Sequence, residues 1–382
     1  MMAKDVLDIK AESAVMDTDK MWIIMGPQHP FSHGLWTLKI QVDGEIVKDA
    51  EPIVGYLHRG WEKEAEARSY PKIIPMADRL CYAASMTYTH LFCMTVEKAL
   101  DIDVPEKAKY IRIVADEICR IQSHLMWLAA VGTDLGNFTV FLWCMREREF
   151  FMDLNVRLCG ARMTTNYPRI GGVRNDTTEL FDRDVMRCVE RFEKVLMDDI
   201  VTLIDDSSVF VSRMKGVGYL TREQTVNLGI TGPAMRGAGV DFDIRRDDPY
   251  DNYDKIDFDV PVMTQGDSYS RYQVRIEEML QSCKIIRQAV QKVKALGKNA
   301  PYRLKVPSNV PAGRSTVRLE DPRGESLMYL ISDGTDKPYR LKVRSPIFTN
   351  VSAAKPLVQG CRIADVPVVM AMIDMCLGET DR

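Results

Sequence analysis

The sequence predicts an α+β protein in which a central multi-helix bundle is flanked by β-structure at both ends. Three observations predict it: apolar and polar residues alternate before residue 60, apolar residues recur at spacings of three and four between 61 and 300, and alternation returns after 300. The 382 residues are enough for two or three structural units at ~100 to 200 residues each. We therefore divide the chain into an N-terminal antiparallel β-region (1–60), a helical bundle (61–300) and a C-terminal β-containing α+β region (301–382).

The N-terminal region reads as a β-hairpin that follows a loop. Strand-like alternation places apolar residues at Trp36, Leu38, Ile40 and Val42, and Asp43-Gly44 is a strong hairpin turn before the return strand. The preceding segment, residues 26–34, reads Gly-Pro-Gln-His-Pro-Phe-Ser-His-Gly, and its two prolines exclude regular helix. Loops held by rigid strands often carry chemistry, so this segment is a candidate site.

Three long segments have one apolar helical face each. Their apolar faces are formed by residues 111, 114, 118, 121, 125 and 128, by residues 181, 185, 188, 192, 195 and 203 with a polar residue at 199, and by residues 272, 276, 279, 283, 286, 290 and 293. Three such helices predict a bundle. A turn-rich insert at 216–265 separates the last two, and Thr221 and Gln224 inside it have capping-box spacing.

The C-terminal region returns to strand-like alternation. Leu327, Tyr329 and Ile331 precede a turn at Asp333-Gly334, and alternation resumes in residues 339–343. The sequence therefore predicts a second hairpin.

Composition limits the classes of function. The net charge of -3 gives no general reason to expect a nucleic-acid partner, and 46% hydrophobic with 27% charged residues is typical of a globular fold. We see no secretory signal and no apolar run near the ~20 residues that span a bilayer, so a membrane would be met through partners. Nine cysteines include no Cys-x-x-Cys pair, which argues against the usual zinc and iron-sulfur spacings and for buried, reduced thiols. With 22 methionines they are a large oxidisable load, which favours an anaerobic cell.

Two of the five histidines, His29 and His33, share the N-terminal loop. They could cap strand ends or bond to backbone, or one could donate a proton beside a carboxylate. A metal is disfavoured because Pro30 prevents the helix that would place both on one face. Asp134 ends an apolar helix, where it is either a helix-end residue or a buried carboxylate that a histidine compensates.

Tyr82 and Arg79 also allow two interpretations. Tyr82 begins an apolar segment and is either a core aromatic residue or a hydrogen-bond donor to the carbonyl or ring nitrogen of an acceptor. Arg79 is either a surface ion-pair residue or a charge beside a redox centre. The residues alone do not choose between these alternatives.

Taken together, several motifs resemble a known family. These motifs are residues 26–34, Gly55-Tyr56-Leu57-His58-Arg59-Gly60-x-Glu62-Lys63, Asp78-Arg79-x-x-Tyr82, Val96-Glu97-Lys98, Arg146-Glu147-Arg148-Glu149, Gly160-Ala161-Arg162-Met163, Arg169-Ile170-Gly171-Gly172-Val173, Arg323-Gly324-Glu325 and Asp381-Arg382. Their combination closely resembles the complex I subunit that forms the quinone site, a relative of the nickel-iron hydrogenase large subunit, and the match is ordered along nearly the whole chain.

The resemblance implies a hydrogenase large-subunit-like fold and a set of roles. His33 and Tyr82 would hold the acceptor headgroup, with His29 in the same binding loop, and Asp134 would bond to His33. Arg79 and Arg59 would lie near a 4Fe-4S cluster on the adjacent subunit. The chain itself would bind no metal or cofactor; its substrate would be a membrane quinone or methanophenazine, and its site a narrow cleft closed by the cluster-bearing partner.

Hydrogenases of this kind hold nickel and iron with two Cys-x-x-Cys pairs. Here the early position reads His58-Arg59-Gly60-Trp61, and the late region, 374–378, keeps only Cys376. A bimetallic thiolate site therefore cannot be assembled, which argues against hydrogen chemistry.

One departure leaves the acceptor open. Cys81 stands where many bacterial and mitochondrial relatives have aspartate, which favours an archaeal relative such as the F-420 dehydrogenase complex, with a NADH-driven complex that reduces quinone as the near competitor. The electron donor (NADH, reduced F-420 or ferredoxin) would be oxidised on another subunit, because no Gly-x-Gly-x-x-Gly loop occurs here. The expected partners are iron-sulfur (B-type), C-type and membrane (H-type) subunits, on the cytoplasmic face of the cell membrane. A non-catalytic docking scaffold is the alternative of another class.

Overall fold

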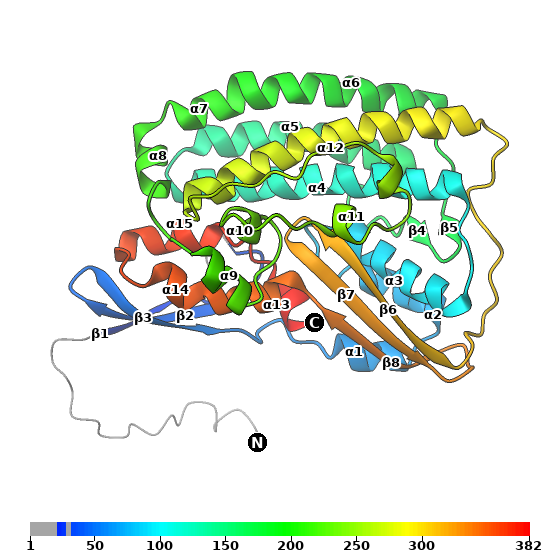
Figure 1. The fold of residues 1–382 in the computed structure, drawn as a ribbon, viewed down its shortest axis with the longest axis horizontal. Coiled ribbons are helices and arrows are strands. Elements are labelled where there is room, and N and C mark those ends of the chain that lie inside the picture. The colour runs from blue at the N-terminus through cyan, green and yellow to red at the C-terminus, as the bar shows by residue number, and fades with distance from the viewer. Residues whose placement is uncertain (1–20, 28–31) are drawn as a thin grey trace.

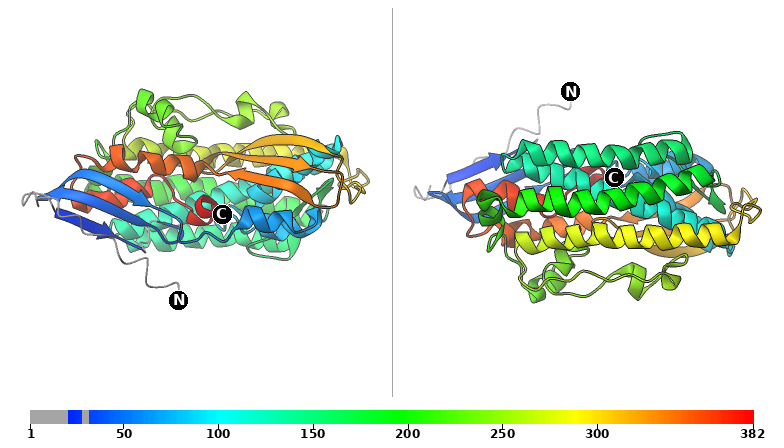
Figure 2. Two further views of the ribbon diagram at one scale, coloured as in Figure 1. Left: turned by 90° about the horizontal axis from the view of Figure 1, so that it is seen from below. Right: turned by 90° about the horizontal axis from the view of Figure 1, so that it is seen from above.

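Long helices form one side of the molecule and two small sheets lie on the other (Figure 1). This computed structural model describes residues 21–27 and 32–382. Helix α4 (Glu106–Asp134) packs against both α5 (Phe138–Cys159) and α12 (Ser268–Leu296), and α6 (Glu179–Val195) packs against α5 and α12. These helices run along the long axis of the molecule (Figure 2). The predicted α+β class with a central bundle is confirmed.

The N-terminal sheet contains the predicted hairpin. Strands β1 (Met21–Met25), β2 (Thr37–Asp43) and β3 (Ile46–Ile53) pair antiparallel in the order β1-β2-β3, and the turn falls at Gly44. Leu38, Ile40 and Val42 are buried, as the alternation predicts.

The bundle begins with shorter helices, α1 (Trp61–Glu66), α2 (Tyr70–Ala77) and α3 (Ser85–Leu100). The sequence did not single out α3 as a helix, because every residue from 85 to 97 is buried and no polar face marks its period. Helix α5 was missed for a related reason: it buries Glu147 and Arg148 but exposes Phe138 and Leu142, so its pattern is mixed.

The second predicted helix is interrupted. Helix α6 passes into a π-helix (Leu196–Val201) and then α7 (Thr202–Asp205), and α8 (Ser208–Met214) follows. The additional residue of the wider turn moves the buried face to Leu196, Ile200 and Ile204. The single face drawn through 195, 199 and 203 was therefore wrong past residue 195, and Asp199 lies off the buried face.

The insert and the sequence before α6 hold only short elements. They are β4 (Pro168–Arg169), β5 (Gly172–Val173), α9 (Arg222–Asn227), α10 (Pro233–Arg236), α11 (Ile244–Asp247) and a 3-10 turn (Tyr253–Lys255). The predicted capping box is present: Thr221 Oγ1 accepts from Gln224 N at 3.0 Å, and Gln224 Oε1 accepts from Thr221 N at 3.0 Å.

The C-terminal region places the chain end between the two sheets. Strands β6 (Gly313–Asp321), β7 (Gly324–Ser332) and β8 (Pro338–Arg344) form an antiparallel sheet, and β7 and β8 are the predicted hairpin. Short helices follow: α13 (Pro346–Asn350), α14 (Ala354–Val358), α15 (Val366–Ala371) and α16 (Leu377–Asp381). Seen from below, the C-terminus lies between β1–β3 and β6–β8 (Figure 2). Residues from both ends of the chain therefore meet at the centre.

Ionic groups are buried inside the helical region as well as at its surface. Arg236 is fully buried and bonds to Glu278 at 2.6 Å and Glu320 at 2.9 Å. His90 lies 2.6 Å from Asp116 and 3.0 Å from Asp251. Buried charges of this kind persist only when they are paired, so these contacts fix the packing of α3, α4, α12 and β6.

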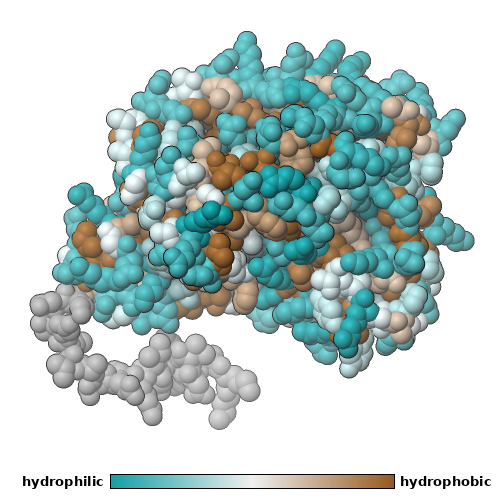
Figure 3. Space-filling view, viewed as in Figure 1, coloured by the Kyte–Doolittle hydropathy of each residue, from teal (hydrophilic) through white to brown (hydrophobic). Residues whose placement is uncertain are grey.

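One face of the molecule is largely polar. The face in Figure 3 is covered mainly by hydrophilic residues, with smaller apolar areas between them. Among the described residues, no helix combines the length and apolar character needed to cross a membrane. Seven of the nine cysteines are buried, as expected, whereas Cys188 and Cys361 are half-buried.

Candidate functional site

His33 is fixed by the C-terminal end of the chain. Its amide donates to Met375 O at 2.8 Å, and its carbonyl accepts from Leu377 N at 2.8 Å, which forms a parallel bridge with residue 376. Gly34 follows with φ +116, and a Cβ there would come within 3.0 Å of Leu377 and Leu57. The loop thus requires glycine at this position, and the His33 side chain is only 6% exposed.

Tyr82 lies next to His33 and comes from a different segment of the chain. It lies in the loop between α2 and α3 and is partly buried, and its ring centroid is 6.1 Å from that of His33 at an interplanar angle of 82°. Residue 378 lies beneath the ring, since a Cβ on Gly378 would be 3.6 Å from Tyr82 and 2.9 Å from Leu80 O. The two residues that the sequence singled out therefore converge, while their roles stay a prediction.

A buried carboxylate anchors the histidine. Asp374 Oδ1 lies 3.4 Å from His33 Nε2 and 3.2 Å from Arg323 Nη2, and Arg323 Nε donates to the Asp374 carbonyl at 2.9 Å. Asp374 and Arg323 are 0% and 1% exposed. Burial opposes ionisation of Asp374, but Arg323, His33 and Arg275 together hold its pKa below the usual range. His33 therefore faces an ionised carboxylate.

The expected partner of His33 was Asp134, and the structure corrects this. Among the described residues, the carboxylate within ion-pair distance of His33 is that of Asp374. Asp134 is the last residue of α4, and burial raises its pKa to about 7. A role for Asp134 stays a prediction. His29, the other candidate in the loop, lies outside the described residues, so the cleft expected beside it is a prediction too.

Arg59 and Arg79 lie together on the surface. Arg59 Nη2 donates to Arg79 O at 2.6 Å, and Arg79 Nη1 donates to Pro75 O at 2.9 Å. Both side chains are exposed. Arg59 N also donates to Arg382 O at 3.0 Å, so this pair is tied to the chain end. The two arginines are available to a partner, and a cluster next to them stays a prediction.

Two thiols and an acid adjoin the Tyr82 loop. Cys81, Cys376 and Glu379 are buried, and their possible ligand atoms all lie within 4.8 Å of one another. Burial raises the pKa of Cys81. Burial opposes ionisation of Cys376 as well, but the Cys81 thiol, Arg323 and His33 lower its pKa to about 6. The residue that adjoins Cys376 is thus Cys81. The sequence analysis placed the early metal position at residues 58–61 instead.

Sequence reasoning gave no role to Asp374, Arg323 or Glu379. Arg323 lay in a matching motif and Asp374 began the late segment, but neither sequence neighbourhood shows what the side chain contacts. The sequence did contain one indication of a role for Asp374. An acidic residue that directly follows the apolar run 366–373 is either buried with a partner or lies where the buried segment ends.

The comparisons with known proteins concern the chain as a whole. The family model described as respiratory-chain NADH dehydrogenase, 49 Kd subunit, matches residues 134–307 and 302–382. The chain belongs to this complex I subunit family. The D-type subunit of NADH-quinone oxidoreductase from Dehalococcoides mccartyi is 44% identical over 98% of this chain and 100% of its own length. The corresponding D-type subunits of Bacillus mycoides (95% of this chain, 99% of its own) and Geobacter sulfurreducens (96% and 99%) are 41% and 40% identical.

A solved structure supports the fold of this family member. A chain of the membrane-bound sulfane sulfur reductase, described as an archaeal respiratory membrane complex, matches with a TM-score of 0.91 and 32% identity over 97% of this chain and 100% of that chain. The hydrogenase-like architecture expected for this complex I subunit family is therefore the one observed, and the protein is a subunit of an oxidoreductase complex.

Proposed function

We propose that this subunit forms the acceptor-reducing site of a complex I-type membrane oxidoreductase. Electrons would pass from a 4Fe-4S cluster on a B-type iron-sulfur subunit to a membrane quinone or methanophenazine bound beside His33 and Tyr82. The observation that supports this most is the convergence of the two rings, whose centroids are 6.1 Å apart in edge contact, with His33 braced on Asp374. Two polar side chains held side by side and bordered by buried apolar side chains can both reach the polar edge of a headgroup that binds next to them.

Reduction of such a headgroup takes two electrons and two protons. The Tyr82 hydroxyl can donate a hydrogen bond to one oxygen or ring nitrogen of the acceptor, and burial keeps this phenol protonated because it raises the pKa of Tyr82 well above its usual value. The imidazole of His33 supplies the second donor.

Coupling to ion translocation would begin with the loss of the imidazole proton. That loss leaves the Asp374 carboxylate facing a neutral ring, while Arg323 stays charged beside it. We propose that the charge change shifts the 374–377 segment, to which the His33 backbone is bonded, and that membrane subunits of H type receive the movement. Asp134 is the second candidate in this relay, and Asp134→Asn with unchanged pumping per electron would remove it.

The exposed pair Arg59 and Arg79 fits the surface that meets the iron-sulfur subunit. Two cations near a cluster would favour the arrival of each electron by stabilising the added negative charge. The C-type subunit completes the expected peripheral assembly on the cytoplasmic face of the membrane. The donor, whether NADH, reduced F-420 or ferredoxin, would be oxidised on another subunit.

One observation supports a second acceptor. The structural neighbour is titled a sulfane sulfur reductase, and Cys81 and Cys376 are two thiols next to Tyr82. Reductive cleavage of a sulfur-sulfur bond also takes two electrons and two protons, so the same electron delivery could serve it. A docking scaffold without chemistry is the other alternative, and a hydrogenase remains disfavoured because no pair of Cys-x-x-Cys motifs is present.

The test uses the whole purified complex in vesicles. Reduction of ubiquinone, menaquinone, a soluble phenazine and a polysulfide is measured with each donor in turn for wild type, Tyr82→Phe, His33→Ala and the control Tyr219→Phe, which removes an exposed hydroxyl elsewhere. We expect Tyr82→Phe and His33→Ala to assemble and lose about 10-fold or more in rate with the preferred acceptor. A scaffold predicts loss of assembly or no effect. Rates unchanged in both variants would refute the proposed site.

A further inference from the structure

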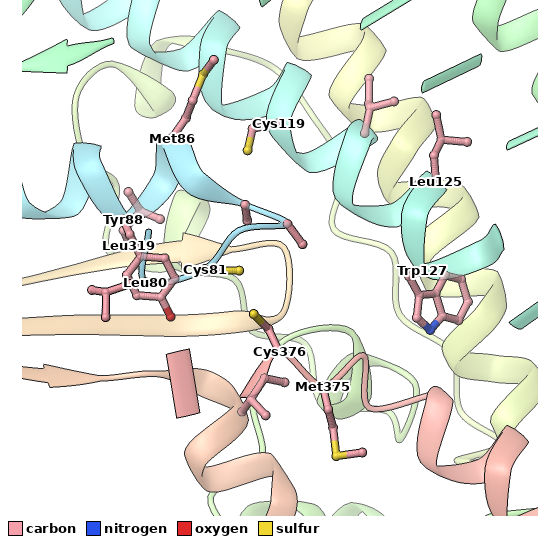
Figure 4. Close-up of a cluster of buried hydrophobic side chains, with 14 of the residues drawn as sticks. Leu80, Cys81, Met86, Tyr88, Cys119, Leu125, Trp127, Leu319, Met375 and Cys376 are labelled. Atoms are coloured by element: carbon pink, nitrogen blue, oxygen red, sulfur yellow. The ribbon is translucent and has the colours of Figure 1, made fainter. Parts of the chain in front are cut away.

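Three potential metal ligands converge beside the site from two separate segments. Cys81 lies in the loop after α2, whereas Cys376 is the N-cap of α16 and Glu379 lies within that helix. Figure 4 shows the sulfur atoms of Cys81 and Cys376 projecting into the same gap between these segments. The three ligand atoms lie within 4.8 Å of one another, and all three side chains are 0% exposed.

Glu379 has no adequate hydrogen-bond partner in this position. Neither of its two carboxyl oxygens accepts a hydrogen bond from an N–H or O–H group of the described residues, although both are buried. A buried polar group without a hydrogen-bond partner destabilises the fold, and two adjacent thiols do little to offset this because S–H is a weak donor. An ordinary core would carry an apolar side chain here. A carboxyl oxygen of Glu379 lies within 4.8 Å of both sulfur atoms, so the three groups can serve one common position.

We propose that Cys81, Cys376 and Glu379 bind one divalent, thiophilic metal ion, for which Zn²⁺ is the best match. Two sulfurs and one oxygen suit zinc, whereas Mg²⁺ and Ca²⁺ take oxygen ligands. Tetrahedral zinc with Zn–S of about 2.3 Å and Zn–O of about 2.0 Å places its ligand atoms roughly 3.5–3.8 Å apart, inside the observed spread. Three ligands are too few for a two-metal thiolate site, so the ion is single.

A buried cation also adjoins the three ligands. Two thiolates and a carboxylate would carry three negative charges, of which a dication would offset two, and Arg323, which also pairs with Asp374, lies beside them. Arg323 Nη1 lies 3.5 Å from Cys81 Sγ, and a hydrogen bond of this kind orients a metal-bound thiolate. Binding would release the protons that the three ligand groups carry, because metal ligands bind in their deprotonated forms.

The remaining coordination position determines what the ion can do. Three protein ligands leave the fourth site of a tetrahedral ion to water or to a substrate atom. Tyr82 directly follows Cys81 in the chain, and its ring packs against Gly378. The ion would therefore brace the Tyr82 loop against the C-terminal segment. This differs from the sequence-based expectation of no metal, and it does not depend on which acceptor the complex reduces.

The test measures metal in the whole complex, purified without oxygen or chelators. Mass spectrometry measures the amounts of zinc and the other first-row metals, and each amount is divided by the amount of complex, determined from its protein content. The samples are wild type, Cys81→Ser, Cys376→Ser and Glu379→Gln. Cys93→Ser is the control, because Cys93 is a buried thiol of α3 outside the cluster. We expect each ligand variant, and not the control, to lose about one zinc per complex. Equal zinc in wild type and ligand variants would overturn the proposal.

A second measurement needs no variant, in case a ligand variant fails to assemble. Zinc-edge X-ray absorption of the wild-type complex should show a shell with sulfur at about 2.3 Å and oxygen or nitrogen at about 2.0 Å. No metal bound at this site, zinc without sulfur neighbours, or a disulfide between residues 81 and 376 found by mass spectrometry would each overturn the assignment. Another metal in the same stoichiometry and lost in the same variants would support the site and correct only the ion.

Discussion

Replacing Asp374 by Asn tests whether this carboxylate, and not Asp134, positions His33. Asn has the same shape and can still accept one hydrogen bond, so the change removes mainly the negative charge. In the structure that charge lies 3.4 Å from His33 Nε2 and 3.2 Å from Arg323 Nη2. Both neighbours would lose their counter-charge inside a buried site, and the charged imidazole would lose its stabilisation.

The expected magnitude follows from these distances. At 3.4 Å and an effective dielectric constant of about 20, the interaction between two unit charges is about 5 kcal/mol, an upper bound for the loss. A hydrogen bond to a charged group contributes about 1.5–3 kcal/mol net, which corresponds to a factor of roughly 10 to 100 in rate. We therefore expect Asp374→Asn to lower kcat for acceptor reduction by about 10- to 100-fold.

The assay compares purified complexes normalised to their iron-sulfur content. Wild type, Asp374→Asn, Asp134→Asn and the exposed control Asp206→Asn are assayed with a saturating quinone or phenazine. Asp374→Asn should show the largest loss. Full activity in an assembled Asp374→Asn complex would refute the reasoning.

Further predictions concern packing and buried charge. Gly378→Ala should raise the KM for the acceptor several-fold without reducing assembly of the complex. The reason is that a Cβ at this position would lie 2.9 Å from Leu80 O, beneath the Tyr82 ring. Titration with the acceptor measures this KM. Burial lowers the pKa of His90, but its two carboxylate partners outweigh this and raise it to about 9 from 6.5. The raised pKa of His90 contributes about 3 kcal/mol to stability, which is present below pH 6.5 and is lost as the pH rises through 9. The midpoint of thermal inactivation should therefore fall between these pH values in wild type but not in His90→Asn. Glu278→Gln should cost about 3 kcal/mol by leaving its buried arginine partner short of a carboxylate, whereas the same change at partly exposed Glu277 should cost little; the midpoints of thermal inactivation distinguish them.

Local patterns predicted most of the regular structure. The alternation at 36–42 and 327–343 and the spacing of three and four in 111–128 and 272–293 became β2, β7, β8, α4 and α12, because one buried face requires one period. Helix α3 was not predicted because it is buried on all sides and so has no polar face. The π-helix at 196–201 was not predicted because one inserted residue changes which side chains face the core without changing the composition.

The site was predicted only in part, for a different reason. His33 and Tyr82 stand in distinctive motifs, and the structure places them together. Asp374 bonds to His33 only because the chain end returns to the N-terminal loop, and such a long-range pairing has no local signature. The same holds for Cys81 and Cys376, which lie far apart in the sequence and meet where the β-bridge fixes residues 33 and 376.

The most direct test is a structure of the assembled complex with a bound quinone or phenazine analogue. We predict that the headgroup lies against His33 and Tyr82, with a polar atom within hydrogen-bond distance of each side chain and Asp374 still against the imidazole. A headgroup bound elsewhere in the chain, with neither of these two residues contacting it, would contradict the proposed site.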